Sequence, residues 1–207
     1  MTVLRVAHRA ANDPASLVAA GRLGADLAEG DVHLRRGRLE LRHAKSLGPL
    51  RWEPWHLVPP TGVVLADLAP HLSGRPLLLL DLKAWQPWLG ARVRDEMSAV
   101  APGAPYAVCS RHWHLLDAFA GLEHVRTVPS VRTERALRRL PARLAGARAW
   151  GVALHASLVC PATVARLRRS VEVVLTWPVP DAAEQARLVA AGATGVIADD
   201  LGGLPAA

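Results

Sequence analysis

Three acidic residues lie near the carboxyl ends of apolar, strand-like stretches of this chain. Glu29 and Asp31 are two positions apart in one stretch, and Asp81 follows four consecutive leucines in another. Because side chains alternate between the two faces of a strand, Glu29 and Asp31 share a face. Burying such charges is costly unless a cation meets them, and an all-oxygen set suits Mg²⁺ or Ca²⁺ better than Zn²⁺. If these stretches end on one side of a sheet, the carboxylates predict a divalent-cation site.

Two basic residues and two histidines accompany the carboxylates. Arg9 follows the first apolar stretch, and Lys83 lies two positions after Asp81 on the same strand face. A site that only holds a metal ion does not need these two basic side chains. A site whose metal also binds a phosphate can use both of them to neutralise the phosphate charge. His8 and His43 carry the side chain that exchanges protons near neutral pH. The set therefore suits general acid–base chemistry on a phosphate compound.

These residues can meet only if the fold brings the strand ends together. Short apolar runs alternate with helix-length amphipathic segments almost from end to end, which indicates strand–helix units around a parallel sheet. About eight such units favour a closed (β/α)8 TIM barrel, whose chemistry belongs at the carboxyl ends of the strands. A shorter piece, Arg38–Arg42, predicts an extra hairpin with the second strand. The expected strands are Leu4–His8, Asp26–His33, Pro76–Leu82, Tyr106–Ser110, Val125–Ser130, Ala149–Leu154, Val171–Trp177 and Gly195–Ala198. The expected helices are Pro14–Gly24, Gly62–Leu72, Pro87–Val100, His112–Leu122, Thr133–Leu144, Pro161–Arg169 and Asp181–Ala191.

Several expected helices begin with residues that favour helix starts. Pro14, Pro87 and Pro161 suit the first helical position, where a missing N–H is not needed. Asp181 followed three positions later by Glu184 predicts a capping box.

The composition is that of a folded domain. The chain has 207 residues, of which 51% are hydrophobic and 21% charged, so we expect a single domain over residues 1–207. No run of 18 apolar residues predicts a membrane span, and the first residues do not read as a signal peptide. Two cysteines, Cys109 and Cys160, make no disulfide framework. We therefore expect a cytoplasmic protein.

The distribution of positive charge along the sequence does not indicate a nucleic-acid-binding surface. The formal net charge is +7, and of the 25 basic residues only Lys45 and Lys83 are lysine. A surface for nucleic acid would cluster these residues with aromatic side chains between them, whereas the arginines are scattered along the chain. We therefore expect no nucleic-acid partner.

The ordered set of motifs resembles the glycerophosphodiester phosphodiesterase family. That family reads His-Arg-Gly, then Glu-x-Asp-Val, and then a second His after a short hairpin. Here residues 6–10 read VAHRA, residues 29–34 read EGDVHL, and residues 39–43 read LELRH. Residues 81–83 read DLK where the family usually has Glu-Ile-Lys, and residues 171–200 are similar to its Trp-containing final strand, helix and ending. The resemblance covers nearly the whole chain.

The resemblance implies a TIM-barrel phosphodiesterase that uses one divalent cation, Mg²⁺ or Ca²⁺, and cleaves a small phosphodiester into glycerol 3-phosphate and an alcohol. Carried over residue by residue, it implies Glu29, Asp31 and Asp81 as metal ligands, His8 and His43 as the acid–base pair, Arg9 and Lys83 as phosphate ligands, and Trp177 as an apolar wall for the alcohol part.

The sequence departs from the family pattern at a few places. Ala10 replaces the usual Gly, Ala44 follows His43 where the family commonly has Asp, and Pro14–Ser16 replaces a segment that begins with Glu. The stretch from His43 to Asp81 spans 38 positions, which is shorter than is typical for a region that recognises the head group. The catalytic set is thus retained, and the substrate-recognition residues differ.

Alternatives stay open at this point. Asp81 in place of Glu is shared with the related spider-venom-type phospholipase D enzymes, so lysophospholipid or sphingolipid head groups are a second substrate class. A barrel that binds phosphate compounds without cleaving them is a third interpretation. Asp81 and Lys83 also fit a simple buried ion pair, His33 fits pocket lining better than metal ligation, and Trp52 with Trp55 fits either a lid or local packing. The sequence leaves the oligomeric state undetermined.

Overall fold

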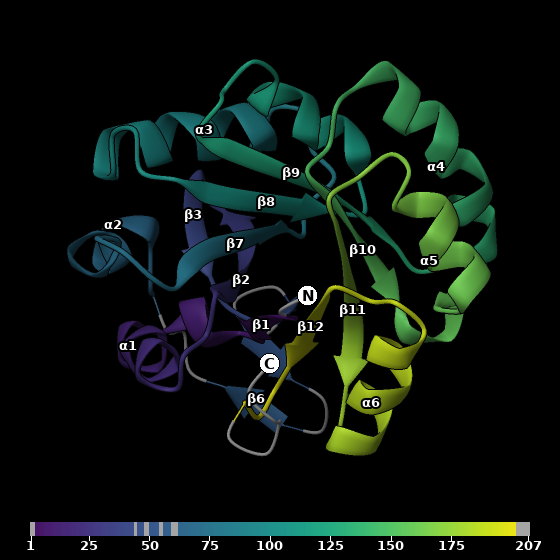
Figure 1. Cartoon of the computed structure of the whole chain (residues 1–207). Coiled ribbons are helices and arrows are strands. Elements are labelled where there is room, and N and C mark those ends of the chain that lie inside the picture. Colours follow the sequence, from purple (N-terminus) through teal and green to yellow (C-terminus); the bar gives the residue numbers. More distant parts are fainter. Residues whose placement is uncertain (1–2, 44, 48–49, 54–55, 59–61, 202–207) are drawn as a thin grey trace.

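Eight parallel strands close into a barrel in which each strand pairs with the next along the chain and the last pairs with the first (Figure 1). The computed structural model describes residues 3–43, 45–47, 50–53, 56–58 and 62–201. The closed ring confirms the TIM barrel expected from the alternating pattern. Its strands are β1 (Leu4–Ala7), β2 (Leu27–Arg35), β7 (Leu77–Leu82), β8 (Tyr106–Ser110), β9 (Val125–Val131), β10 (Gly151–His155), β11 (Val173–Val179) and β12 (Gly195–Ala198).

The helices lie outside the ring of strands (Figure 1). They are α1 (Pro14–Arg22), α2 (Leu65–Leu68), α3 (Leu89–Val100), α4 (Glu134–Gly146), α5 (Pro161–Leu167) and α6 (Ala182–Ala190). Over the part of the chain that is described, none of them has the length and apolar character needed to cross a membrane.

The helix starts follow the expected chemistry in most cases. Pro14 and Pro161 occupy first helical positions, whereas Pro87 lies two residues before α3. The Asp181 carboxylate accepts a hydrogen bond from the Glu184 N–H at 2.8 Å, as the capping pattern predicts. Asp13 caps α1 in the same way through the Ser16 N–H at 2.7 Å.

The apolar residues form two layers. Side chains from all eight strands fill the barrel interior, among them Val6, Leu79, Val128 and Leu175. A larger core lies between the strands and the surrounding helices. Side chains fill the interior, and in barrels of this kind the site lies at the carboxyl-end mouth, where the connections from strands to helices lie.

One hairpin and one small sheet extend from the barrel after β2. Strand β3 (Arg38–Leu41) pairs antiparallel with the end of β2, which confirms the predicted hairpin. The short strands β4 (Lys45–Leu47), β5 (Leu50–Glu53) and β6 (His56–Val58) form a separate antiparallel sheet. We expected only a loop here, because strands of three or four residues are too short to give a readable alternation.

Two expected helices differ from the prediction. The segment 62–72 is helical only from Leu65, and it changes to a 3-10 turn (Ala69–His71) where Pro70 supplies no N–H for an α-helical bond. The segment 112–122 contains the 3-10 helix η3 (Trp113–Phe119) in place of an α-helix.

A glycine in α3 permits the close approach of η3. A Cβ atom at Gly90 would lie 2.1 Å from the Leu115 carbonyl oxygen and 3.1 Å from the Ala118 Cβ. We expect Gly90→Ala to lower the free energy of unfolding by about 1–3 kcal/mol, because the two helices must separate. Urea denaturation measures this change. Gly146→Ala is the matched control, since nothing lies within 4 Å of its added methyl, and an equal loss there would contradict the packing explanation.

Candidate active site

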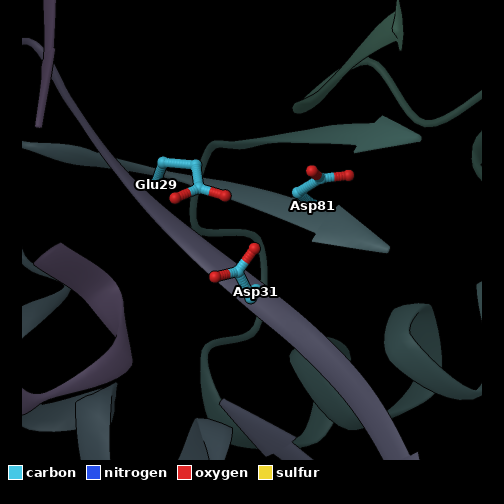
Figure 2. A group of neighbouring side chains, drawn as sticks. All are labelled: Glu29, Asp31 and Asp81. Atoms are coloured by element: carbon cyan, nitrogen blue, oxygen red, sulfur yellow. The ribbon is translucent and has the colours of Figure 1, made fainter. Parts of the chain in front are cut away.

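Strands β2 and β7 bring the three predicted carboxylates together at the mouth of the barrel. Glu29 and Asp31 project from β2, and Asp81 lies beside Asp31 in the parallel register of the two strands. One oxygen from each of the three side chains lies within 4.8 Å of the others, and Figure 2 shows the cluster on its two strands. Glu29 and Asp31 are buried, and Asp81 is half-buried.

Lys83 partly neutralises this cluster. Its Nζ lies 2.7 Å from Asp31 Oδ1 and also forms an ion pair with Asp81. Burial would lower the pKa of Lys83, but the surrounding carboxylates, Asp81 first, reverse that effect and raise it. One ammonium group thus faces three carboxyl groups, and a cation that binds here would favour ionisation of all three.

The three carboxyl groups respond differently to burial. Burial, reinforced by the charge of Asp31, raises the pKa of Glu29 well above its usual range. Burial also raises the pKa of Asp81, although Lys83 opposes the shift. For Asp31 burial acts in the same direction, but the hydrogen bond with His43 and the charge of Lys83 outweigh it and hold its pKa below the usual range. The cluster therefore contains one carboxylate that stays ionised and two that resist ionisation.

The donor set fits a hard divalent cation. Oxygen ligands bind Ca²⁺ at bond lengths that allow two of them to lie at most about 5 Å apart. One oxygen of each of the three carboxyl groups lies within 4.8 Å of the others, which meets that limit. Mg²⁺ has shorter bonds, so the three oxygens would need to move only slightly closer to bind it. Carboxylates alone do not select a soft metal.

His8 lies beside the cluster and is held by an acidic residue. Its Nδ1 lies 2.6 Å from Asp199 Oδ1, and its Nε2 lies 4.0 Å from Glu29 Oε2. Burial lowers the pKa of His8, and the hydrogen bond with Asp199 opposes that shift. The carboxylate of Asp199 fixes the proton on Nδ1, so Nε2 is the nitrogen that faces the site.

His43 lies across the site from His8, with 6.3 Å between the ring centroids. Its Nδ1 lies 3.1 Å from Asp31 Oδ2, and its Nε2 lies 2.7 Å from the Arg9 guanidinium. Since arginine can only donate, His43 Nε2 accepts that hydrogen bond and Nδ1 carries the proton. His43 is therefore neutral in this arrangement, with a basic nitrogen directed at Arg9.

The backbone of Arg9, at the end of the first strand, contacts the carboxylate cluster. Its residue has a left-handed conformation (φ 59°), and its N–H donates to Glu29 Oε2 at 2.8 Å. Such a conformation is uncommon outside glycine and tends to occur at functional sites.

Two residues at the site were not predicted. Asn12 donates from its side-chain amide to Asp31 Oδ2 at 3.2 Å and accepts from the Asp31 N–H at 2.8 Å, so it orients a member of the carboxylate cluster. Asp199 orients His8 as described above. Asn12 is the only asparagine of the chain and Asp199 directly follows β12, but neither feature alone signals a contact.

Trp177 lies on the opposite part of the mouth, near the end of β11. Its ring packs edge-to-face with His155 of β10, with 5.1 Å between centroids. His33 is half-buried on β2, and burial followed by the charge of Arg42 lowers its pKa to about 4. Ala44, Trp55 and the side chain of Trp52 lie outside the described residues.

Comparisons with solved structures agree with the resemblance in sequence. The chain matches a candidate glycerophosphoryl diester phosphodiesterase from Silicibacter pomeroyi with a TM-score of 0.78 at 18% identity, over 97% of this chain and 91% of that one. It matches an Oleispira antarctica phosphodiesterase in complex with the product sn-glycerol-3-phosphate (TM-score 0.70, 18% identity, 96% and 93% covered). It also matches a glycerophosphodiester phosphodiesterase from Thermotoga maritima (TM-score 0.71, 16% identity, 97% and 96% covered). No family model and no curated protein matches the sequence. The fold is thus that of glycerophosphodiester phosphodiesterases over nearly the full length.

Proposed function

We propose that this protein hydrolyses glycerophosphodiesters to glycerol 3-phosphate and an alcohol, with one bound divalent cation. The observation that carries the proposal is the convergence of Glu29, Asp31 and Asp81 with two histidines at the mouth of the barrel. The solved structure with sn-glycerol-3-phosphate bound has the same fold and supports this substrate class.

Glu29, Asp31 and Asp81 would hold the cation, and Asn12 would keep Asp31 oriented toward it. The cation would polarise the phosphate oxygens and lower the charge that an incoming nucleophile meets. Arg9 and Lys83 would bind the charge that builds on the phosphate in the transition state. Trp177 would form an apolar wall for the alcohol part of the substrate.

The two histidines would move the protons. A water molecule attacks phosphorus and gives its proton to one histidine; if a hydroxyl of the substrate attacks instead, the product is a cyclic phosphodiester, which water must then open by the same acid–base exchange to give glycerol 3-phosphate. The bond from phosphorus to the alcohol oxygen breaks, and the other histidine donates a proton to that oxygen. Each ring has one nitrogen hydrogen-bonded to a carboxylate, Asp199 for His8 and Asp31 for His43, which suits a histidine that carries positive charge for part of the reaction.

Hydrolysis assays test the proposal directly. The purified protein should cleave bis-p-nitrophenyl phosphate and glycerophosphocholine when Mg²⁺ or Ca²⁺ is present. Chelation with EDTA should stop the reaction, and added cation should restore it. Cleavage that EDTA leaves untouched would exclude the metal-assisted reaction. A rise in Tm with glycerol 3-phosphate and cation, without product from any diester, would indicate the non-catalytic barrel instead.

A phospholipase D-like reaction on lysophospholipid or sphingolipid head groups is the second candidate, because Asp81 replaces the usual Glu in the carboxylate cluster. The chemistry at phosphorus would be the same, with a longer apolar part on the substrate. Turnover of lysophosphatidylcholine well above that of glycerophosphocholine would favour this candidate, and the reverse ratio would favour the first.

A further inference from the structure

Two tryptophans are exposed beside the mouth of the barrel. Among the described residues the exposed large hydrophobic side chains are Trp85 (67% exposed), Trp88 (53%) and Leu23 (52%). Both tryptophans lie in the connection between β7 and α3, which begins at Lys83. Because this connection follows the carboxyl end of a barrel strand, the indoles lie on the same side of the molecule as the acidic cluster.

Exposed arginines lie on the two neighbouring connections. Arg111 directly follows β8, and Arg132 directly follows β9. Strands β7, β8 and β9 are adjacent in the barrel (Figure 1), so their connections are adjacent at its mouth. We call Trp85, Trp88, Arg111 and Arg132 the Trp–Arg rim.

The charges around this rim favour a negatively charged surface. His112 and His114 lie next to Arg111, and Glu134 at the start of α4 is the acidic residue nearest in sequence to Arg132. The exposed carboxylate of Asp199 follows β12, which lies on the opposite side of the ring from β8. On the inner side of the rim, Asp81 of the acidic cluster interacts electrostatically with Arg111 and His112. The outer part of the rim thus joins apolar aromatic area to positive charge.

We propose that the Trp–Arg rim binds the surface of an anionic phospholipid membrane, with the mouth of the barrel facing the lipid. Indole side chains suit the interface between lipid and water, because one edge is apolar and the N–H still finds a hydrogen-bond partner. Arginines near such a surface are attracted to anionic head groups. A second copy of this chain is a poorer partner, because pairing two rims would bring their arginines together. Binding through the rim does not depend on whether the proposed hydrolysis occurs.

Sedimentation with lipid vesicles tests this proposal. The intact protein is mixed with vesicles of phosphatidylcholine alone, or of phosphatidylcholine and phosphatidylglycerol in equal parts, and EDTA is present so that lipid turnover does not contribute. We expect binding to the anionic vesicles that weakens as salt is added. The double variant Trp85→Ser, Trp88→Ser should bind at least about tenfold more weakly. Arg111→Gln and Arg132→Gln should each weaken binding about fivefold.

The opposite end of the molecule offers matched controls. Arg22 ends α1 and Leu23 follows it, so both exposed side chains lie at the amino-terminal side of the barrel. Arg22→Gln and Leu23→Ser should leave vesicle binding unchanged. Equal losses in these controls would mean that general positive charge or apolar exposure drives binding, and would overturn the proposal. Absence of binding to anionic vesicles would also overturn the proposal. Self-association in solution would overturn it too, if the tryptophan variant abolishes that association while vesicle binding persists. Unchanged Tm values would show that the variants fold.

Discussion

Replacing either His8 or His43 by alanine should lower kcat for glycerophosphocholine by about 10²–10⁴-fold. Each ring has one nitrogen fixed by a carboxylate, Asp199 for His8 and Asp31 for His43. The other nitrogen of His8 lies toward Glu29, and that of His43 accepts from Arg9 and would become available when the guanidinium turns to the phosphate, so each histidine can exchange one proton with a bound substrate. The loss should appear in kcat more than in KM, because proton transfer acts in the transition state.

The leaving group separates the two roles. The p-nitrophenolate anion is stable enough to leave without being protonated. An alkoxide leaves only when the general acid protonates it. The variant that lacks the general acid should therefore lose much less activity on bis-p-nitrophenyl phosphate than on glycerophosphocholine, and the variant that lacks the base should lose activity on both. His124→Ala is the control, since His124 packs against Tyr106 at the amino-terminal end of β8, away from the mouth. Full activity of both His8→Ala and His43→Ala would remove the histidines from the mechanism.

The barrel and its carboxylate cluster could be predicted because both depend on short, regular patterns. A strand places alternate residues on one face, so Glu29 and Asp31 had to project together. Parallel strands in a barrel end on one side, so Asp81 and Lys83 had to come near them. These are consequences of periodicity and topology, and they need no knowledge of which side chains touch.

The contacts that orient the site could not be predicted in the same way. Asp199 meets His8 only when β12 pairs with β1 and closes the ring, across most of the chain. Asn12 precedes an Asp-Pro pair and reads as part of a turn, yet its amide bonds Asp31 on the next strand. The exposure of Trp85 and Trp88 likewise depends on how the connection after β7 leaves the barrel. In each case tertiary structure, and not local pattern, determines the partner.

The lysine at the centre of the cluster leads to the second large effect. Lys83 Nζ contacts both Asp31 and Asp81, so Lys83→Met leaves a buried and a half-buried carboxylate without this ammonium group. In the presence of EDTA we expect the free energy of unfolding to fall by about 3–5 kcal/mol, as when one partner of a buried ion pair is removed. The loss should grow as the pH rises. Lys83 opposes the upward pKa shifts of Glu29 and Asp81, so its removal raises both pKa values further. A carboxyl with a raised pKa keeps in the folded chain a proton that the unfolded chain releases above about pH 4, so folding of the variant becomes less favourable as the pH rises from there.

Divalent cation should reverse much of this loss if the carboxylates form its site. Saturating Ca²⁺ or Mg²⁺ should raise Tm more in Lys83→Met than in the unaltered protein, because the ion then supplies all of the missing positive charge. Hydrolysis should stay low even with cation, since the phosphate loses one of its two basic ligands. Arg187→Met is the control: its pair with Glu184 on α6 is partly exposed and far from the cluster, so its removal should change the stability by about 1 kcal/mol at most, with or without cation. An equal rise in Tm for Lys83→Met and the unaltered protein would place the cation away from Asp31 and Asp81, and would contradict the proposed ligand set.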